Sequence, residues 1–523
     1  MGVLAQRVPE LQRLTNQKKD LRRQTMTYEI DCFMWTHQEH FHTNWELDAQ
    51  HLFRKLDPDF KVRLLMVGFL KEDLDDRKQI CPVPDNSPLQ PDVYSGVLAE
   101  ADEIEKTHPR YGNLHGDAGV EDRVNGGIKR WALAKAVENR IESEAGQGQR
   151  TFAGSPVRLH GYDVVVALQV DDETCTKYYE IPRDRLRHTE YDEEYGVMQS
   201  LVEATAWEFL DECCNAMKRD SQESPGTYFG TGTHHNDILV RSGRRLLDAA
   251  AIAGGSQASD WALFDKCTKL STLTYEGKSG AGSLVFVNEG AKEDTEISIC
   301  FKKSVDISEV GATRKVLEMS GSSMSLLCNG RNIYGLGKLN EAGDFQNAFE
   351  VVFDKQFRWS FKHQGKVLAN VAYGIPSLPR PAFNRDAFES LVADKFGDAD
   401  NDVLSNLVGA ICESNHGGLL VISENAESEA ARLVSQGTPV NAVKLSNDQI
   451  RLISQIDGAV IVDPTGVCFA LGVILDGHAN DNCTSARGAR YNSALRYAHE
   501  QPKTIAVVKS EDGMVDIFPH SNA

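Results

Sequence analysis

The sequence predicts a multidomain protein of the α/β class. The chain has 523 residues, whereas one domain usually holds about 100 to 200. A mostly β pattern gives way, after a proline-rich segment, to buried strands that alternate with amphipathic helices. We therefore predict four parts: a partly helical region of unassigned fold (1–125), an α/β region (126–239), a mostly β module (240–375) and a C-terminal α/β domain (376–523).

The first two regions contain few secondary-structure signals. Residues 8–23 have a polar, basic helical pattern. From residue 126 onward the pattern is clearer and predicts a helix at 124–142, a strand at 162–170 and a longer helix at 195–214. One face of the longer helix is apolar at helical spacing and is expected to be buried: Met198, Leu201, Val202 and Phe209.

The third region predicts a mostly β module. Seven apolar segments are separated by Gly and Asn turns: TLTYEG, SLVFVNEG, EISICFKK, SMSLLCNG, AFEVVFD, FRWSFKHQG and KVLANVAYG. The segment IPSLPRP that follows holds three prolines in seven residues. Proline-rich segments are stiff and extended, so we expect a linker there.

The last region alternates helical and strand patterns. Two amphipathic helices carry apolar faces at Phe388, Leu391 and Val392 and at Leu404, Leu407, Val408 and Ile411. The later elements are the strand HGGLLVIS, the helices AESEAARLVSQ and LSNDQIRLISQI, the strands AVIVD and CFALGVIL with the turn DPTG between them, the helix NSALRYAHEQ and the strand pair in TIAVVKSEDGMVDIF. This order predicts a sheet with helices packed against it.

Composition excludes several classes of function. The net charge of −20 argues against binding nucleic acid or anionic membranes through overall charge, because both are polyanions. No apolar run approaches the roughly 18 to 20 residues that span a bilayer, and the first residues lack the apolar centre of a secretion signal. We therefore expect a cytoplasmic protein with no membrane or nucleic-acid partner.

Three polar segments of the last domain offer the groups that phosphoryl transfer requires. Asp457 precedes a buried strand, where a carboxylate can hold a divalent cation, although an Asp-Gly pair is usually only a turn. Gly488 leads into a predicted helix beside Arg487 and Arg490, an arrangement that favours anions. Ser510 and Glu511 follow a later strand and offer a hydroxyl and a second carboxylate. Each segment alone is weak evidence for a site.

The order and spacing of HGGLLVIS, DGAVIV, ALGVIL, GARYNSA and VVKSE resemble the diadenylate cyclase (DAC) domain family over about residues 385–520. The resemblance implies a mixed β-sheet flanked by helices. It also implies condensation of two ATP molecules into cyclic di-AMP, with release of pyrophosphate and with Mg²⁺ or Mn²⁺ as cofactor. Because each ATP supplies one nucleophile and one electrophile, two such domains must face each other, which implies a homo-oligomer. The upstream regions would then be a regulatory part, with the β module as a candidate sensor.

The resemblance assigns roles by position. Asp457 and Arg490 would be catalytic, and Asp457 and Glu511 would bind the metal. Asp457 would also help to activate the 3′-hydroxyl of one ATP, and Gly458 would let the nucleotide approach the backbone. The implied ATP-binding residues are Gly458, Ala459, Leu475, Gly488, Ala489, Arg490, Tyr491, Asn492, Ser493 and Ser510.

The chain departs from the family at the second motif, where threonine and then arginine, histidine and arginine follow the glycine. Here Ala489, Arg490, Tyr491 and Asn492 occupy those positions, so only the first arginine remains. A guanidinium clamps phosphate through two parallel hydrogen bonds, which neither Tyr nor Asn reproduces. The alternatives are therefore an active cyclase with a divergent loop, an inactive nucleotide or cyclic-dinucleotide receptor, and a synthase of a different dinucleotide.

Overall fold

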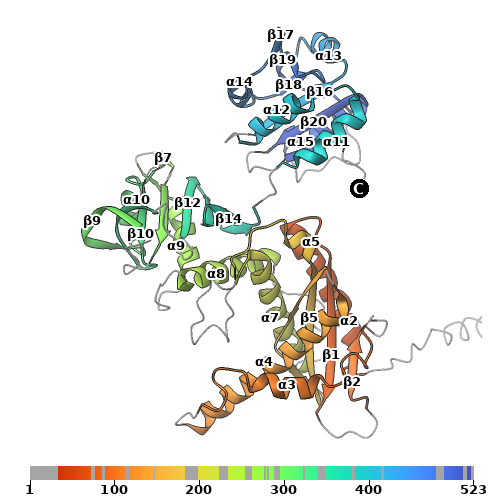
Figure 1. The fold of residues 1–523 in the computed structure, drawn as a ribbon, viewed down its shortest axis with the longest axis vertical. Helices are drawn as coiled ribbons and strands as arrows, with labels where there is room; N and C mark the ends of the chain where they lie inside the picture. Colours follow the sequence, from red (N-terminus) through yellow and green to blue (C-terminus); the bar gives the residue numbers. More distant parts are fainter. Residues whose placement is uncertain are drawn as a thin grey trace, which may run out of the picture. The chain divides into compact units, whose positions relative to one another are not determined.

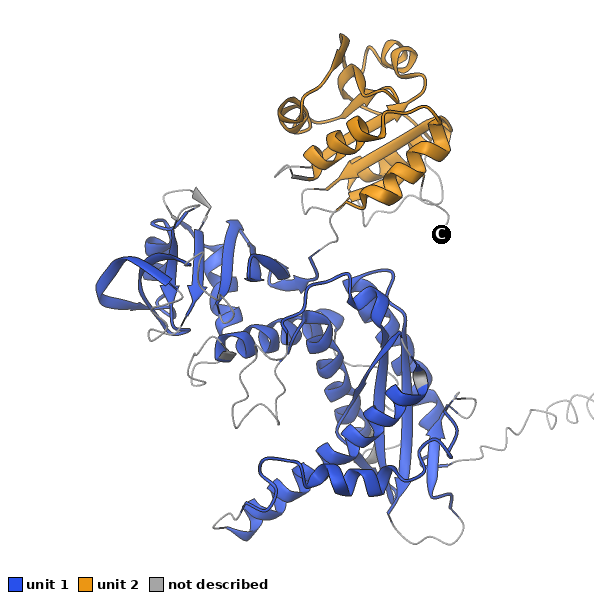
Figure 2. Ribbon diagram, in the orientation of Figure 1, with its two compact units in different colours: residues 1–379 blue, residues 380–523 orange. Residues whose placement is uncertain are grey.

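The chain folds into two compact units, unit 1 (Met1–Pro379) and unit 2 (Arg380–Ala523) (Figure 2). The structure, a computed structural model, describes residues 33–71, 77–84, 87, 89–113, 117–146, 148–182, 198–222, 234–253, 262–275, 278–279, 282–287, 295–321, 324–339, 348–379, 383–413, 417–478, 488–510 and 515–519. The helix predicted at residues 8–23 lies outside these residues. Each unit has its own buried cores, so each is described separately.

Unit 1 contains two large sheets and the helices that cover them (Figure 1). Its helices are α2 (Gln38–Leu56), α3 (Val97–Glu105), α4 (Ala118–Ala145), α5 (Asp172–Cys175), α7 (Leu201–Gln222), α8 (His235–Ala253), α9 (Leu263–Thr272) and α10 (Val310–Leu317). Its strands are β1 (Val62–Leu70), β2 (Ile80–Val83), β3 (Gln149–Ala153), β4 (Val157–Leu159), β5 (Tyr162–Asp171), β6 (Thr274–Tyr275), β7 (Lys278–Ser279), β8 (Gly282–Phe286), β9 (Thr295–Asp306), β10 (Ser325–Cys328), β11 (Asn332–Leu339), β12 (Phe349–Lys355), β13 (Arg358–His363), β14 (Lys366–Ala372) and β15 (Ile375–Ser377).

The first sheet is antiparallel, with the order β2-β1-β5-β3 and with β4 beside β5. Alternate residues of β1 point to opposite faces, as the pleat requires. Leu64 and Met66 join a core with residues of α2 and α7, whereas Leu65 and Val67 join a second core with residues of α3 and α4. The sheet is therefore covered by helices on both faces.

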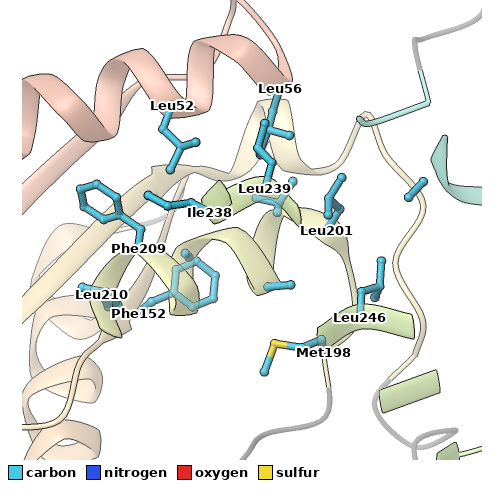
Figure 3. Packing of buried hydrophobic residues seen from close by; sticks show 14 of the residues in the cluster. Leu52, Leu56, Phe152, Met198, Leu201, Phe209, Leu210, Ile238, Leu239 and Leu246 are labelled. Carbon is cyan, nitrogen blue, oxygen red and sulfur yellow. The ribbon is translucent and has the colours of Figure 1, made fainter. Parts of the chain in front are cut away.

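The apolar face predicted for α7 is buried. Figure 3 shows this packing, in which Leu201 and Phe209 of α7 and the preceding Met198 lie among residues of α2 and α8. The helix begins at Leu201, later than the predicted residue 195. The core made by α7 and α8 continues into the second sheet, because the same cluster contains residues of β12, β13 and β14.

The second sheet has eight strands in the order β15-β14-β13-β12-β8-β10-β11-β9. Only β8 and β10 run parallel; the other neighbouring pairs are antiparallel. The mostly β character predicted for this part is confirmed. The prediction missed β11, whose sequence NIYGLGKL contains two glycines that lower its strand signal.

Unit 2 is a three-layer α/β domain. Its helices are α11 (Arg385–Phe396), α12 (Asn401–Glu413), α13 (Ala426–Arg432), α14 (Asn447–Ile453) and α15 (Ala489–Glu500). Its strands are β16 (Gly418–Ser423), β17 (Thr438–Lys444), β18 (Ala459–Val462), β19 (Val467–Val473), β20 (Thr504–Lys509) and β21 (Val515–Phe518). The sheet order is β17-β19-β18-β16-β20-β21, with β16 and β18 parallel and the other pairs antiparallel.

The two faces of this mixed sheet have separate cores. Leu419 and Val421 of β16 pack with residues of α13 and α15, whereas Leu420 and Ile422 pack with residues of α11, α12 and α14. Burial on both faces explains why β16 reads as a continuous apolar run. The predicted mixed sheet flanked by helices is confirmed. The prediction missed β17, which lies at the sheet edge and is mostly exposed.

Two predicted boundaries in unit 1 do not divide the structure. The boundary after residue 125 falls inside α4, and β1 from the first predicted region pairs with β5 from the second. The predicted helix over residues 124–142 is part of α4, which begins six residues earlier at Ala118, on the other side of the predicted boundary. The boundary after residue 239 falls inside α8. The division between units follows Pro379, a few residues after the predicted boundary at 375.

Candidate functional site

The turn that carries Asp457 is held by structure on both sides. Before it, Ser446 and Gln449 form a reciprocal capping box at the start of α14, and Ile450 of that helix is buried. After it, Ala459 is fully buried and pairs with Val473 across β18 and β19. The Asp457 side chain itself is 83% exposed. A fixed backbone thus presents a carboxylate that a ligand can reach.

Gly458 is a glycine because of the fold. Its φ is +103°, a conformation that side chains rarely adopt. A Cβ at this position would lie 2.4 Å from the carbonyl carbon of Gly472 and 2.8 Å from the nitrogen of Val473. The backbone that approaches Gly458 is therefore β19. The predicted role of this glycine toward a nucleotide remains a prediction.

The start of α15 is open by comparison. Gly488 is its N-cap, with φ −67° and ψ 172°, and no side chain caps the helix. An ideal Cβ at Gly488 would meet no described atom within 4 Å. Helix N-termini leave backbone N–H groups that favour anions. As far as the described residues go, this end of α15 thus has room for an anionic group.

Arg490, in the first turn of α15, lies beside Asp457. Its Nη2 atom is 3.3 Å from Oδ1 of Asp457, and the arginine side chain is 30% exposed. The Nε atom of Arg490 is buried and makes no hydrogen bond within the described residues. An exposed ion pair of this kind contributes at most about 1 kcal/mol, so a ligand can separate it easily. The two side chains predicted to be catalytic are therefore neighbours.

Strand register brings the other predicted segments to the same edge of the sheet. Gly418 of β16 pairs with Lys509 of β20, and two residues further along β16 Leu420 pairs with Val460 of β18. Ser510, which follows β20, therefore lies at the edge where β18 begins. Only β16 separates β18 from β20, so the backbone at Ser510 lies roughly 10 Å along the edge from the backbone at Asp457.

The remaining predicted residues occupy different environments. Leu475 is buried in the core beneath α15, and Ala489 is exposed. The ring of Tyr491 packs edge-on against Phe518 of β21, with centroids 5.0 Å apart. Asn492 and Ser493 accept hydrogen bonds from Arg496, through the backbone oxygen and the hydroxyl respectively. The segment that departs from the family motif thus forms the first turn of α15 and is partly committed to packing.

A divalent cation fits the described residues only if a bound nucleotide supplies part of its coordination shell. Within the described residues, no three His, Cys, Asp or Glu side chains converge on one point. Glu511 and Arg487 lie outside the described residues. Mg²⁺ is usually held by one or two carboxylates and completes its shell with phosphate oxygens and water. Asp457 alone suits a cation that arrives with a nucleoside triphosphate.

One polar network behind this edge was missed in the sequence. Arg432 of α13 bonds both Glu429 and Asp476, and Glu429 also accepts a hydrogen bond from the Tyr497 hydroxyl of α15 at 2.7 Å. Asp476-Gly477 is an Asp-Gly pair that follows a strand, and this was the signal that the sequence offered. The partners are 44 and 68 residues apart in sequence, and no local pattern links them.

Three family models match the chain. The model of the DAC family, described as "DisA bacterial checkpoint controller nucleotide-binding", matches residues 408–522. Models described as "Probable sensor domain DACNG" and "Probable sensor domain DACNH" match residues 34–247 and 261–365. Both of these ranges lie within unit 1, and their limits differ from the boundaries predicted after residues 125 and 239.

Two solved structures are similar over a quarter of the chain. A double mutant of DacA from Staphylococcus aureus is 17% identical, with 25% of this chain and 83% of that chain covered and a TM-score of 0.20. A hypothetical membrane spanning protein from Bacillus cereus is 16% identical, with 25% and 66% covered and a TM-score of 0.21. No curated protein matches the chain. Among the helices of the described residues, none combines the length and apolarity needed to cross a membrane.

Proposed function

Because its C-terminal unit contains a domain of the DAC family, we propose that this protein is a diadenylate cyclase, which condenses two ATP molecules into cyclic di-AMP and releases pyrophosphate. One observation carries the proposal. Asp457 and Arg490, which are 33 residues apart in sequence, stand 3.3 Å apart at one edge of the sheet. Nucleotidyl transfer needs a carboxylate that can bind a cation beside a guanidinium that can bind a phosphate, and Asp457 and Arg490 supply these two groups.

Each residue has a defined task in this proposal. The bound Mg²⁺ or Mn²⁺, held by Asp457 with Glu511 as a further carboxylate, would neutralise charge on the triphosphate. Arg490 and the amides at the start of α15 would bind phosphate oxygens once the nucleotide separates the ion pair with Asp457. The 3′-hydroxyl of one ATP would attack the α-phosphate of the other. In each of two such transfers a new P–O bond forms, the α–β phosphoanhydride breaks, the 3′-hydroxyl proton is lost to water with the help of Asp457, and one pyrophosphate leaves.

Two copies of the site are required, because each ATP both attacks and is attacked. The partner is therefore a second chain whose DAC domain faces the first. The two sensor-domain matches occupy unit 1. In this proposal they regulate the cyclase, with the chain acting in the cytoplasm as a signalling enzyme.

The experiment incubates the full chain with each of the four NTPs and either Mg²⁺ or Mn²⁺ and identifies the products by mass spectrometry. We expect cyclic di-AMP and pyrophosphate from ATP, and neither from the Asp457→Asn variant. A different dinucleotide would redirect the proposal to another base. Turnover that persists in Asp457→Asn would contradict the assignment of the site.

A second candidate is a receptor without turnover. It is favoured by the first turn of α15, where Tyr491 packs on Phe518 and the second arginine of the family motif is replaced by Asn492. A receptor needs only to hold its ligand, whereas an enzyme must also hold the leaving pyrophosphate. Tight binding of cyclic di-AMP by calorimetry, with no product from any NTP, would support the receptor.

A further inference from the structure

Arg432 lies at the centre of a polar network between two helices and a loop. Its Nε atom donates to both carboxylate oxygens of Glu429, at 3.0 and 3.1 Å. Its two Nη atoms donate to Asp476, with 3.0 Å between Nη2 and Oδ1. A guanidinium can serve two carboxylates at once because its five N–H groups point in fixed directions. Arg432 therefore connects α13 to the segment after β19.

The same network reaches α15 through Glu429. This carboxylate is almost buried, and it accepts the Tyr497 hydroxyl in addition to the Arg432 guanidinium. Burial alone would raise the pKa of Glu429, but the hydrogen bonds from Arg432 and Tyr497 outweigh it and lower that pKa. A buried carboxylate that lost its cationic partner would be strongly unfavourable. Removing Arg432 is therefore expected to disturb Glu429 as well.

The segment that Arg432 holds is the one that leads from β19 toward α15. Leu475 comes directly before Asp476 and is buried in the core beneath α15. Gly477 has φ +137°, and a Cβ there would lie 3.1 Å from the backbone of Arg496 in α15. His478 follows and bonds Glu500 at the end of the same helix. The segment is therefore attached to α13 on one side and to α15 on the other.

Tyr497 and Arg490 belong to one short helix. They are seven residues apart, which is about 10 Å at 1.5 Å per residue. A helix of this length moves as a rigid rod, so a shift at Tyr497 moves the first turn that carries Arg490. Arg490 lies beside Asp457. The network thus contacts the same helix that carries Arg490.

We propose that Arg432 is a positioning residue for the nucleotidyl-transfer site. It fixes α15, and with it Arg490, against Asp457 through Glu429, Tyr497 and Asp476. This inference rests on the proposed function for its effect on turnover. Its effect on the order of α15 does not depend on that function.

Unit 2 contains a matched control for this arginine. Arg385 of α11 also bonds two carboxylates, Glu389 at 2.6 Å and Asp402 at 2.7 Å. The two arginines have similar exposure, 46% for Arg385 and 40% for Arg432. Asp402 is 87% exposed, whereas Glu429 is 12% exposed. The Arg385 cluster joins α11 to α12, and its hydrogen bonds among the described residues involve Glu389, Asp402 and Ser405, none of which is a site residue.

The experiment compares Arg432→Gln and Arg385→Gln in the full chain. Hydrogen exchange of the α15 amides and steady-state kinetics with ATP are measured at a temperature where both variants are folded. We expect Arg432→Gln to speed exchange of the hydrogen-bonded amides of α15 and to lower kcat/KM, each by about tenfold, because hydrogen bonds between charged groups are lost. Arg385→Gln should stay within about twofold of the wild type, as expected for an exposed pair.

A double substitution separates positioning from mere stability. If Arg432 acts through Arg490, then Arg432→Gln should cost no more than about twofold in kcat/KM in the Arg490→Ala background, because residues in one network are not additive. Full additivity would overturn the proposal. If Arg432→Gln fails to fold, Tyr497→Phe tests the same contact between Glu429 and α15, because it removes only the hydroxyl. Exchange in α15 that stays at the wild-type rate in Tyr497→Phe would also overturn the proposal. Faster α15 exchange in a protein that forms no dinucleotide would refute the proposed function and leave the positioning role standing.

Discussion

The turn at Asp457-Gly458 and the helix start at Gly488 lie at the same edge of the unit 2 sheet, but their backbones are constrained very differently. Gly458 has φ +103° and would clash with β19 if it carried a Cβ. Gly488 has an ordinary extended conformation, and an ideal Cβ there meets no described atom. The first glycine is required by the fold, whereas the second leaves room for a ligand.

The Asp457 turn and the start of α15 should therefore respond differently to substitution. The acid stands on a turn between a capped helix and a buried strand, so its backbone has one position. The arginine stands on a helix whose location is set by side-chain contacts, which include the apolar core beneath it and the hydrogen bond between Tyr497 and Glu429. Substitutions should therefore separate into those that act on stability and those that act on nucleotide binding.

The largest effect is expected from Asp457→Asn. The side chain is exposed, so the melting temperature should stay close to that of the wild type. An amide is a poor ligand for a hard cation, and losing several kcal/mol of charge stabilisation lowers kcat by about 10³-fold. The measurement pairs cyclic di-AMP formation with calorimetric ATP binding, which should persist.

Asp448→Asn is the control for this variant. Asp448 is another exposed aspartate that pairs with an arginine, Arg451, at 3.0 Å, but it belongs to the surface of α14. We expect wild-type turnover from it. Equal losses in the two variants would mean that the Asp457 carboxylate has no special role.

The next effect is expected from Gly458→Ala, and it concerns stability. A left-handed φ on alanine costs about 1 to 3 kcal/mol, and a forced clash adds a similar amount. The melting temperature of unit 2, followed by calorimetry, should fall by several degrees or more. A variant that melts like the wild type but no longer binds ATP would show instead that the glycine serves the ligand.

Arg490→Ala should have a smaller effect that is confined to binding. Its ion pair with Asp457 is exposed and adds little to folding. Losing a charge-assisted bond to phosphate should raise the ATP KM by about tenfold. Arg490→Lys should recover part of that loss, because it keeps the charge but not the planar fork. A fall in the melting temperature without a change in KM would place Arg490 in the fold and not in the site.

Buried apolar strands and helical periodicity are local signals, and they were sufficient to predict the unit 2 layers. That Asp457 and Arg490 belong to one site was implied only by the resemblance to the DAC family, because no local pattern fixes the strand directions that bring them together. The reason for Gly458 was not predictable, because it depends on irregular pairing with β19. The contacts of Arg432 were not predictable either, because its partner Asp476 is distant in sequence.

Gly488→Ala should give the smallest effect and the clearest contrast with Gly458→Ala. The position has an extended backbone with open space around it, so alanine fits without strain. Alanine is a poorer N-cap than glycine, which limits the expected loss of stability to about 1 kcal/mol. If a phosphate occupies the open space, the added methyl group should instead raise the ATP KM by a few fold, measured beside the melting temperature of both variants. Equal falls in melting temperature for the two glycine variants would remove the distinction between them, whereas a KM effect at Gly488 alone would place the triphosphate at the start of α15.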